Sequence, residues 1–271
     1  MARVIIITSG KGGVGKTTTT SNIGMALARL GYETLLIDAD VGLRNLDLLL
    51  GLENRIIYTG LDVLSDTCRL EQALINDKRQ AKLTFFPLSS SQAKVPITKS
   101  QIQKLVSLLE DQYEFILIDS PAGIDEGFQT ALTSAKEAVV VVTPEVPSIR
   151  DADKVIGILV SQEIKKISLL VNRIRPKMVK TDDMMSIDDV KNILGVPLGG
   201  VIPDSEQVII ASNRGEPLVL EEKLSLPGLA FENTARRILG QDVEFLNLDV
   251  PISRNPMKRF LSNFMNKSNS D

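Results

Sequence analysis

The stretch SGKGGVGKTTTTSN at residues 9–22 directly follows the apolar run RVIIIT at residues 3–8. A short β-branched run predicts a buried strand, and the residues after the glycines predict an amphipathic helix that begins at residue 16. Between them, Gly10, Gly15, Lys16 and Thr17 fit the pattern G-x-x-x-x-G-K-[ST] of a phosphate-binding loop. Because this loop needs a strand before it and a helix after it, the stretch predicts an α/β fold.

The loop chemistry predicts a site for Mg²⁺ and a nucleoside triphosphate. Glycines let the backbone approach phosphates closely, and the start of the following helix adds N–H groups and its dipole. We expect Lys16 to contact the β- and γ-phosphates and the hydroxyl of Thr17 to bind Mg²⁺. The residues expected to line the nucleotide phosphates are Gly10, Lys11, Gly12, Gly13, Val14, Gly15, Lys16, Thr17 and Thr18.

The rest of the chain alternates short apolar runs with helical stretches, which predicts a doubly wound, mostly parallel sheet. Strands are expected at 3–8, 33–38, 82–88, 114–119, 137–143, 166–172 and 197–203. Helices are expected at 16–30, 98–111, 149–162, 186–194, 204–213 and 228–239. Since nothing divides residues 1–240, we expect them to form one P-loop domain, followed by a linker at 241–256 and a helix at 257–267.

Three aspartates lie at the predicted ends of two strands. The strand FILID ends in Asp119, the arrangement of a Walker B carboxylate that supports the metal. Asp38 and Asp40 end another strand and are two residues apart, so both can point toward one crevice. We expect one of them to support the metal shell and the other to orient a water. Both are candidate metal residues together with Thr17 and Asp119, and Asp40 is the candidate for orienting the water. The alternative is that these aspartates are solvated loop acids or caps.

The composition excludes several other classes of site. The chain of 271 residues has no histidine, which excludes histidine bases and histidine metal ligands. Its one cysteine, Cys68, cannot form an intramolecular disulfide or a two-cysteine metal pair. No apolar run approaches the length of a membrane span. The net charge of −3 gives no general attraction to nucleic acid, and we therefore expect no nucleic-acid partner.

The loop contains a second lysine, Lys11, which leaves it at the second position. From there it points away from the phosphates of its own loop, so it could reach a nucleotide held by another subunit, as an arginine finger does. The alternative is a solvated loop lysine. The residues alone leave both possibilities open.

The stretch MKRFLSNFMNK at 257–267 predicts a cationic amphipathic helix. Its apolar residues follow helical spacing and are Met257, Phe260, Leu261, Phe264 and Met265. Lys258 lies beside this apolar arc and Arg259 lies behind it. Such a helix is typical of an anchor at the surface of an anionic membrane. The alternative is a terminal helix that docks on the protein itself.

Several stretches resemble the ParA/MinD ATPase family, whose deviant Walker A motif carries an extra lysine as in KGGVGKT. The similarity covers about residues 1–240 and includes IDADVGLRNLDLLLG, QALINDKR, DSPAGI, PEVPSIRDADKVIGIL and ASNRGEP. GLRNLDL and DSPAGI are specific to the branch that positions the division septum. The resemblance implies a P-loop fold, the cofactors ATP and Mg²⁺, hydrolysis of ATP, and a homodimer that forms on ATP and binds membrane.

The resemblance also implies roles for individual residues. Lys11 would act across the dimer, Asp40 would position water, and Asn172 would read adenine, with Pro203 in the loop on the other side of the base. Arg44 and Asn45 would belong to switch I, and residues 120–124 to switch II.

Implied partners are a MinC-like division inhibitor and a MinE-like activator, with the protein in the cytoplasm on the inner face of the cell membrane, or in a plastid stroma on the inner envelope. A ParA-type DNA partitioning ATPase is the alternative function.

Overall fold

One sheet of eight strands organises the computed structural model, which describes residues 1–41, 44–89 and 97–248. The strands are β1 (Arg3–Thr8), β2 (Thr34–Asp38), β3 (Ile75–Asn76), β4 (Leu83–Pro87), β5 (Phe115–Asp119), β6 (Glu137–Val142), β7 (Lys166–Ile174) and β8 (Leu198–Pro203). Their order is β3-β4-β2-β5-β1-β6-β7-β8, and every neighbouring pair is parallel except β3 with β4. The predicted doubly wound, mostly parallel sheet is confirmed.

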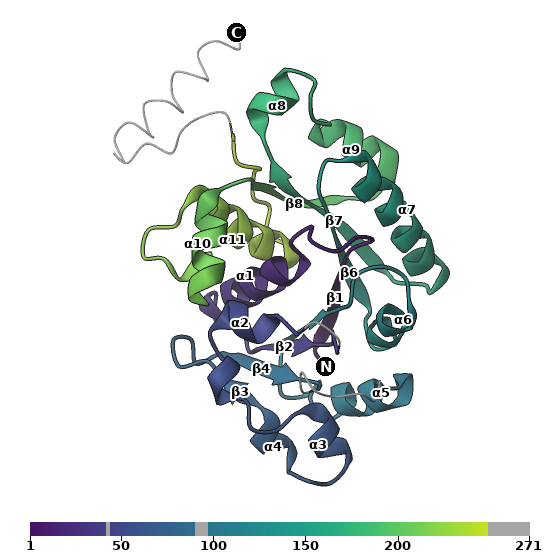
Figure 1. Cartoon of the computed structure of the whole chain (residues 1–271), viewed down its shortest axis with the longest axis vertical. Coiled ribbons are helices and arrows are strands. Elements are labelled where there is room, and N and C mark those ends of the chain that lie inside the picture. Colours follow the sequence, from purple (N-terminus) through teal and green to yellow (C-terminus); the bar gives the residue numbers. More distant parts are fainter. Residues whose placement is uncertain (42–43, 90–96, 249–271) are drawn as a thin grey trace.

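Helices cover both faces of this sheet (Figure 1). Their bounds are α1 (Lys16–Arg29), α2 (Leu46–Leu50), α3 (Gly60–Leu64), α4 (Leu70–Ala73), α5 (Lys99–Ser107), α6 (Glu126–Leu132), α7 (Val146–Ser161), α8 (Pro176–Lys180), α9 (Ile187–Leu194), α10 (Glu206–Arg214) and α11 (Leu226–Ile238). The buried core on one face includes residues of α5, α6, α7 and α9, and the core on the other includes residues of α1, α2 and α11. Among the helices of the described chain, none is long and apolar enough to cross a membrane.

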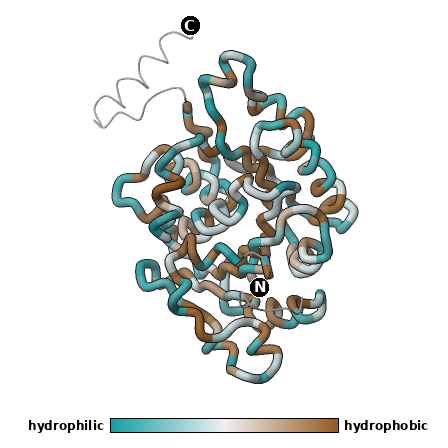
Figure 2. Tube along the Cα trace, in the orientation of Figure 1, coloured by the Kyte–Doolittle hydropathy of each residue, from teal (hydrophilic) through white to brown (hydrophobic). Residues whose placement is uncertain are grey.

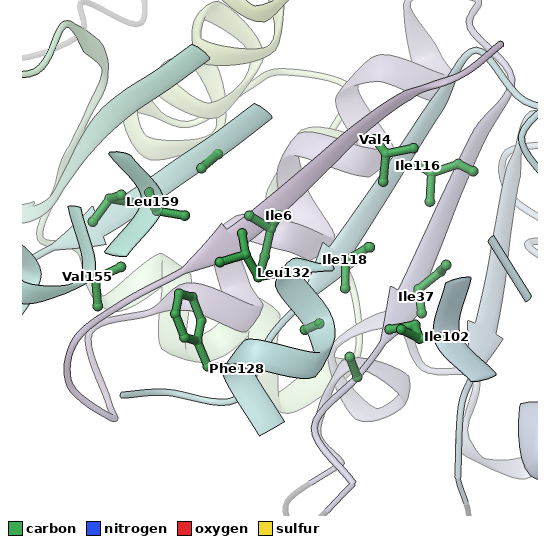
Figure 3. Packing of buried hydrophobic residues seen from close by; sticks show 14 of the residues in the cluster. Val4, Ile6, Ile37, Ile102, Ile116, Ile118, Phe128, Leu132, Val155 and Leu159 are labelled. Carbon is green, nitrogen blue, oxygen red and sulfur yellow. The ribbon is translucent and has the colours of Figure 1, made fainter. Parts of the chain in front are cut away.

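The strands are apolar on both sides because each face is covered. In β1, Val4 and Ile6 belong to one core, whereas Ile5 and Ile7 belong to the other. Figure 3 shows Phe128 and Leu132 of α6 close to Ile6. The hydrophobic segments accordingly run through the middle of the molecule along the strands, as Figure 2 shows.

The predicted elements differ from the structure mainly at short or proline-containing segments. The helix expected from residue 149 begins at Val146, because Pro147 in its first turn is compatible with a helix, where its missing N–H is not needed. The short helices α2, α3, α4, α6 and α8 and the two-residue strand β3 were not predicted. The predicted helix at 257–267 and residues 249–256 of the predicted linker lie outside the described residues.

An ion-pair cluster joins three strands at the end of the sheet opposite the phosphate-binding loop. Arg3, the first residue of β1, donates from Nε and Nη2 to the two carboxylate oxygens of Glu137 at 2.7 and 2.6 Å. Lys166, the first residue of β7, lies 3.7 Å from the same carboxylate. Burial alone would raise the pKa of Glu137, but the hydrogen bonds and charges of Arg3 and Lys166 outweigh it and lower that pKa.

This cluster predicts an acid-dependent contribution to stability. Because the folded pKa of Glu137 is lowered, its contribution is present above the ordinary carboxyl pKa and is lost as the pH falls through the folded value. Glu137→Gln should therefore lower the free energy of unfolding by about 1–2 kcal/mol at pH 7. The difference from wild type should shrink toward about pH 3 in urea unfolding experiments. An equal difference at both pH values would contradict this role.

Candidate nucleotide-binding site

The phosphate-binding loop is held by backbone packing at both of its ends. Gly15, the residue that caps α1, has φ of +94°, a conformation that favours glycine. At the other end, a Cβ on Gly10 would lie 2.3 Å from the carbonyl carbon of Asp151 in α7. The loop therefore lies directly against the backbone of α7, and its first glycine is required for this contact.

Lys16 and Asp119 form a buried ion pair at the start of α1. The Nζ of Lys16 lies 3.0 Å from Oδ1 of Asp119, and both side chains are buried. The hydroxyl of Thr20, one helical turn after Lys16, donates to the same carboxylate oxygen at 2.9 Å. The structure thus brings the predicted phosphate-binding lysine and the predicted Walker B aspartate into direct contact.

Asp38 and Asp119 are neighbours at the carboxyl ends of adjacent parallel strands. The register of β2 and β5 pairs these two residues. Both oxygens of the Asp38 carboxylate accept backbone hydrogen bonds, from Asp40 at 3.1 Å and from Leu46 at 3.2 Å. Burial, followed by the nearby negative charge of Asp119, raises the pKa of Asp38 to about 8. Asp38 therefore holds the loop that carries Asp40 through these two backbone hydrogen bonds.

The oxygen groups gathered here fit a magnesium ion that also binds phosphates. Thr17 is the second residue of α1, directly after Lys16, while Asp38 and Asp119 end adjoining strands. Mg²⁺ usually takes one or two carboxylates and completes its shell with water and phosphate oxygens. The described residues contain no group of three or more acidic, cysteine or histidine side chains that could hold a metal ion by themselves.

Asp40 follows the strand end and is partly exposed. It lines a cavity of about 360 Å³ together with Pro121 of the predicted switch II and Gly127 and Thr130 of α6. In the predicted switch I, the guanidinium of Arg44 contacts the buried carboxylate of Asp47 at 2.8 Å. Both predicted switch segments therefore adjoin the loop that carries Asp40.

Lys11 is exposed, in contrast to the buried Lys16. Its carbonyl accepts a hydrogen bond from the Ser9 hydroxyl at 3.0 Å, and Gly123 of switch II donates its N–H to the Ser9 carbonyl at 2.9 Å. Within the described chain, the Lys11 ammonium forms no ion pair with an acidic side chain. The structure places the two lysines of the loop in different environments, one inside the site and one on the surface.

Asn172 and Pro203 lie on the neighbouring strands β7 and β8. Asn172 is buried, and its side-chain amide donates to the Val14 carbonyl of the phosphate-binding loop at 2.8 Å. Pro203 pairs with Ile174, two residues farther along β7. Both residues are thus at the carboxyl end of the sheet, as the predicted base-binding role requires, and Asn172 in addition contacts the loop itself.

Three contacts of the site were not predicted from the sequence, and one of them is the bond from Asn172 to the Val14 carbonyl. Thr20 is four residues after Lys16, a helical spacing that could have indicated a shared face toward Asp119. The contact of Gly10 with Asp151 joins segments far apart in the sequence and had no local signal.

Comparison with known proteins places this geometry in a family. The model of CbiA, the CobQ/CobB/MinD/ParA nucleotide binding domain, matches residues 5–218. The chain belongs to this family. The resemblance seen in the sequence is confirmed, and so is its P-loop fold.

Individual members of the CobQ/CobB/MinD/ParA family are similar over nearly the whole chain. A putative septum site-determining protein MinD from Emiliania huxleyi is 69% identical over 268 residues, which cover 99% of this chain and 98% of that protein. The MinC:MinD cell division protein complex of Aquifex aeolicus contains a chain with 48% identity and a TM-score of 0.84, covering 91% of this chain and 99% of that one. Septum site-determining MinD of Pyrococcus horikoshii, complexed with Mg-ADP, has 28% identity and a TM-score of 0.79 over 88% of this chain and 96% of its own.

The packing at Gly10 predicts that two glycines of the loop tolerate alanine differently. Gly10→Ala should destabilise the protein by roughly 1–3 kcal/mol, because the new methyl group would overlap the Asp151 backbone. Gly12→Ala is the matched control, since a Cβ there meets no atom within 4 Å and Gly12 does not have a positive φ. Thermal unfolding without nucleotide measures the difference, and equal melting temperatures for the two variants would refute the contact.

Proposed function

We propose that the protein is an ATP-hydrolysing switch that dimerises on binding ATP, attaches to an anionic membrane and places the division septum by recruiting a division inhibitor. The observation that carries the proposal is the buried contact of Lys16 with Asp119 at the start of α1, beside Asp38. A cation, two carboxylates and a phosphate-binding loop at one sheet edge suit a magnesium nucleotide. The 69% identical relative named septum site-determining protein supports the cellular role.

The side chains divide the work of ATP hydrolysis among them. The Thr17 hydroxyl and Asp119 would hold Mg²⁺, with Asp38 nearby. The ion would neutralise charge on the phosphates. Lys16 would bind the β- and γ-phosphates from inside the loop, where its burial strengthens the interaction. Asp40, which lines a cavity and follows the fixed Asp38, would orient the attacking water. The Mg-ADP complex of the P. horikoshii relative supports this choice of cofactor.

Dimerisation would depend on Lys11. Two subunits that meet across their nucleotide sites bring two triphosphates close together, and these anions repel each other. Lys11 is exposed at the loop surface, so its ammonium could reach the nucleotide of the partner subunit and offset that repulsion. The dimer would then form with ATP bound on both sides.

Membrane attachment would use the predicted helix at 257–267. Its five apolar side chains would contribute roughly 1–2 kcal/mol each on insertion, while ordering its backbone would cost roughly 1 kcal/mol per residue. The nearby basic residues would add roughly 1 kcal/mol apiece at an anionic surface. One helix therefore binds marginally, whereas two on one dimer raise avidity by roughly 10²–10⁴. Dimerisation would thereby control attachment.

The proposed partners follow from the relatives. One similar structure is a MinC:MinD complex, which supports a MinC-like inhibitor as a partner. A MinE-like activator of hydrolysis, which the sequence resemblance implies, would complete the cycle. The location would be the inner face of the cell membrane or of a plastid envelope. A ParA-type role on DNA is less favoured, because the net charge is −3 and the high-identity relative is a septum-site protein.

Alanine substitutions of the two loop lysines should impair different steps, ATP binding for Lys16 and dimerisation for Lys11. Lys16→Ala should abolish ATP binding, because the phosphates lose their buried cation. Lys11→Ala should still bind Mg-ATP as a monomer and yet fail to dimerise, measured by analytical ultracentrifugation in an Asp40→Ala background that blocks turnover. Asp40→Ala alone should dimerise normally and serves as the control.

Three results would contradict these assignments. A normal ATP-dependent dimer of the Lys11→Ala variant would remove the role across the interface. Loss of ATP binding by its monomer would instead place Lys11 among the residues that bind their own nucleotide. Unchanged ATP affinity of the Lys16→Ala variant would overturn the site itself.

A further inference from the structure

The side chain of Asn172 is engaged inside the protein at both ends of its amide. Its Nδ2 donates to the Val14 carbonyl at 2.8 Å, and its Oδ1 accepts from the N–H of Arg173 at 2.9 Å. The Val14 carbonyl can only accept a hydrogen bond and the Arg173 N–H can only donate one, so these two partners fix which end of the amide is oxygen and which is nitrogen. Asn172 is 6% exposed, which means that these bonds are shielded from water.

The backbone of β7 is bent to make this contact. Arg173 has φ of +57°, a left-handed conformation that is uncommon for a residue other than glycine. At the same place the pairing of β7 with β8 shifts register, between Val171 and Ile174. The bend brings the N–H of Arg173 back onto the Asn172 side chain. Such local strain is retained where the surrounding contacts require it.

The same side chain packs against the glycine that begins α1. A Cβ on Gly15 would lie 2.2 Å from Nδ2 of Asn172, so a side chain at position 15 would displace the asparagine. Val14, whose carbonyl receives the hydrogen bond, is itself buried. Asn172 therefore contacts the loop at two consecutive residues, immediately before Lys16.

We propose that Asn172 is a positioning residue that holds the phosphate-binding loop in its binding conformation before any nucleotide arrives. The hydrogen bond to Val14 fixes the peptide that precedes Gly15, and hence the direction of the first N–H groups of α1 and the position of Lys16. The asparagine keeps one amide hydrogen and one lone pair unused by these two bonds, so it can hold the loop and also read a base. The expected effect of Asn172 on ATP affinity rests on the proposed function, whereas its expected effect on the conformation of the loop does not.

Hydrogen–deuterium exchange of the ligand-free protein tests the proposal directly. Asn172→Ala removes the bond, and Asn172→Asp keeps the size of the side chain and the acceptor for Arg173 but removes the donor to Val14. Both should speed exchange in peptides covering residues 10–19 by roughly tenfold or more, the loss expected when a buried carbonyl loses its partner. Peptides of α11 should not change. Asn233→Ala, at another buried asparagine in α11, is the matched control and should leave the loop peptides unchanged.

The alternatives give different results. Unchanged exchange at residues 10–19 in both variants would overturn the proposal and leave Asn172 as a base reader. Faster exchange in Asn172→Ala but not in Asn172→Asp would also overturn it, because the side chain would then act by filling space. Faster exchange throughout the protein would indicate a general structural role and equally refute a local one. If Asn172→Ala does not fold, the Asn172→Asp variant decides.

Calorimetric titration with Mg-ATP and Mg-ITP separates this proposal from the proposed function. Inosine lacks the 6-amino group of adenine, so a residue that only reads the base should lose affinity mainly for ATP on substitution. A residue that holds the loop should lose affinity for both nucleotides by the same factor, and loss confined to ATP would contradict it. Failure of the wild-type protein to bind Mg-ATP would refute the proposed function, while the exchange experiment would still decide the role of Asn172.

Discussion

Two buried carboxylates that lie side by side impose the main physical constraint on this molecule. Asp38 and Asp119 are paired in register at the ends of β2 and β5, and both are shielded from water. Two buried carboxyl groups this close cannot both be ionised without compensation: the pKa of Asp38 is raised, and Lys16 lies 3.0 Å from Asp119 as its cation. Removing one member of a buried pair typically costs about 3–5 kcal/mol. The loop that presents Lys16 is thus tied to the sheet edge by charge as well as by backbone geometry.

The rest of the site depends on that edge. The start of the phosphate-binding loop packs against α7 through Gly10. The end of the loop, just before α1, packs against Asn172 of β7. The predicted switch II segment is joined to the loop by the hydrogen bond from the Gly123 N–H to the Ser9 carbonyl. The segment after Asp38 is joined to that aspartate by the hydrogen bond from the Leu46 N–H. The phosphate-binding loop is therefore in contact with α7, with β7 and with the segment predicted as switch II.

Much of the fold and the site could be predicted from the sequence because the decisive signals are local. An apolar run followed by Gly10–Thr17 defines the strand, the loop and the helix within fifteen residues. Asp38 and Asp119 were found because each ends an apolar strand, and parallel strands bring their carboxyl ends to one edge. Their direct register could not be predicted, because it depends on β5 inserting between β1 and β2.

The contacts that escaped prediction are long-range or made by backbone. The approach of Gly10 to Asp151 and the bond from Asn172 to Val14 join residues more than a hundred positions apart. The short helix α6 was missed because its seven residues are too few for a clear periodicity, although Phe128 at its centre is fully buried. The resemblance implied a role for Asn172 at the base alone, whereas its side chain also contacts the phosphate-binding loop.

Sedimentation with anionic liposomes tests the central claim, a membrane switch driven by ATP, most directly. The wild-type protein should sediment with the vesicles in Mg-ATP and stay in solution in Mg-ADP, because ATP joins two weakly binding helices in one dimer. The Phe260→Asp variant should bind ATP normally and remain in solution in both nucleotides. Sedimentation of the wild-type protein that is equal in ATP and ADP, or that persists in the Phe260→Asp variant, would contradict the account.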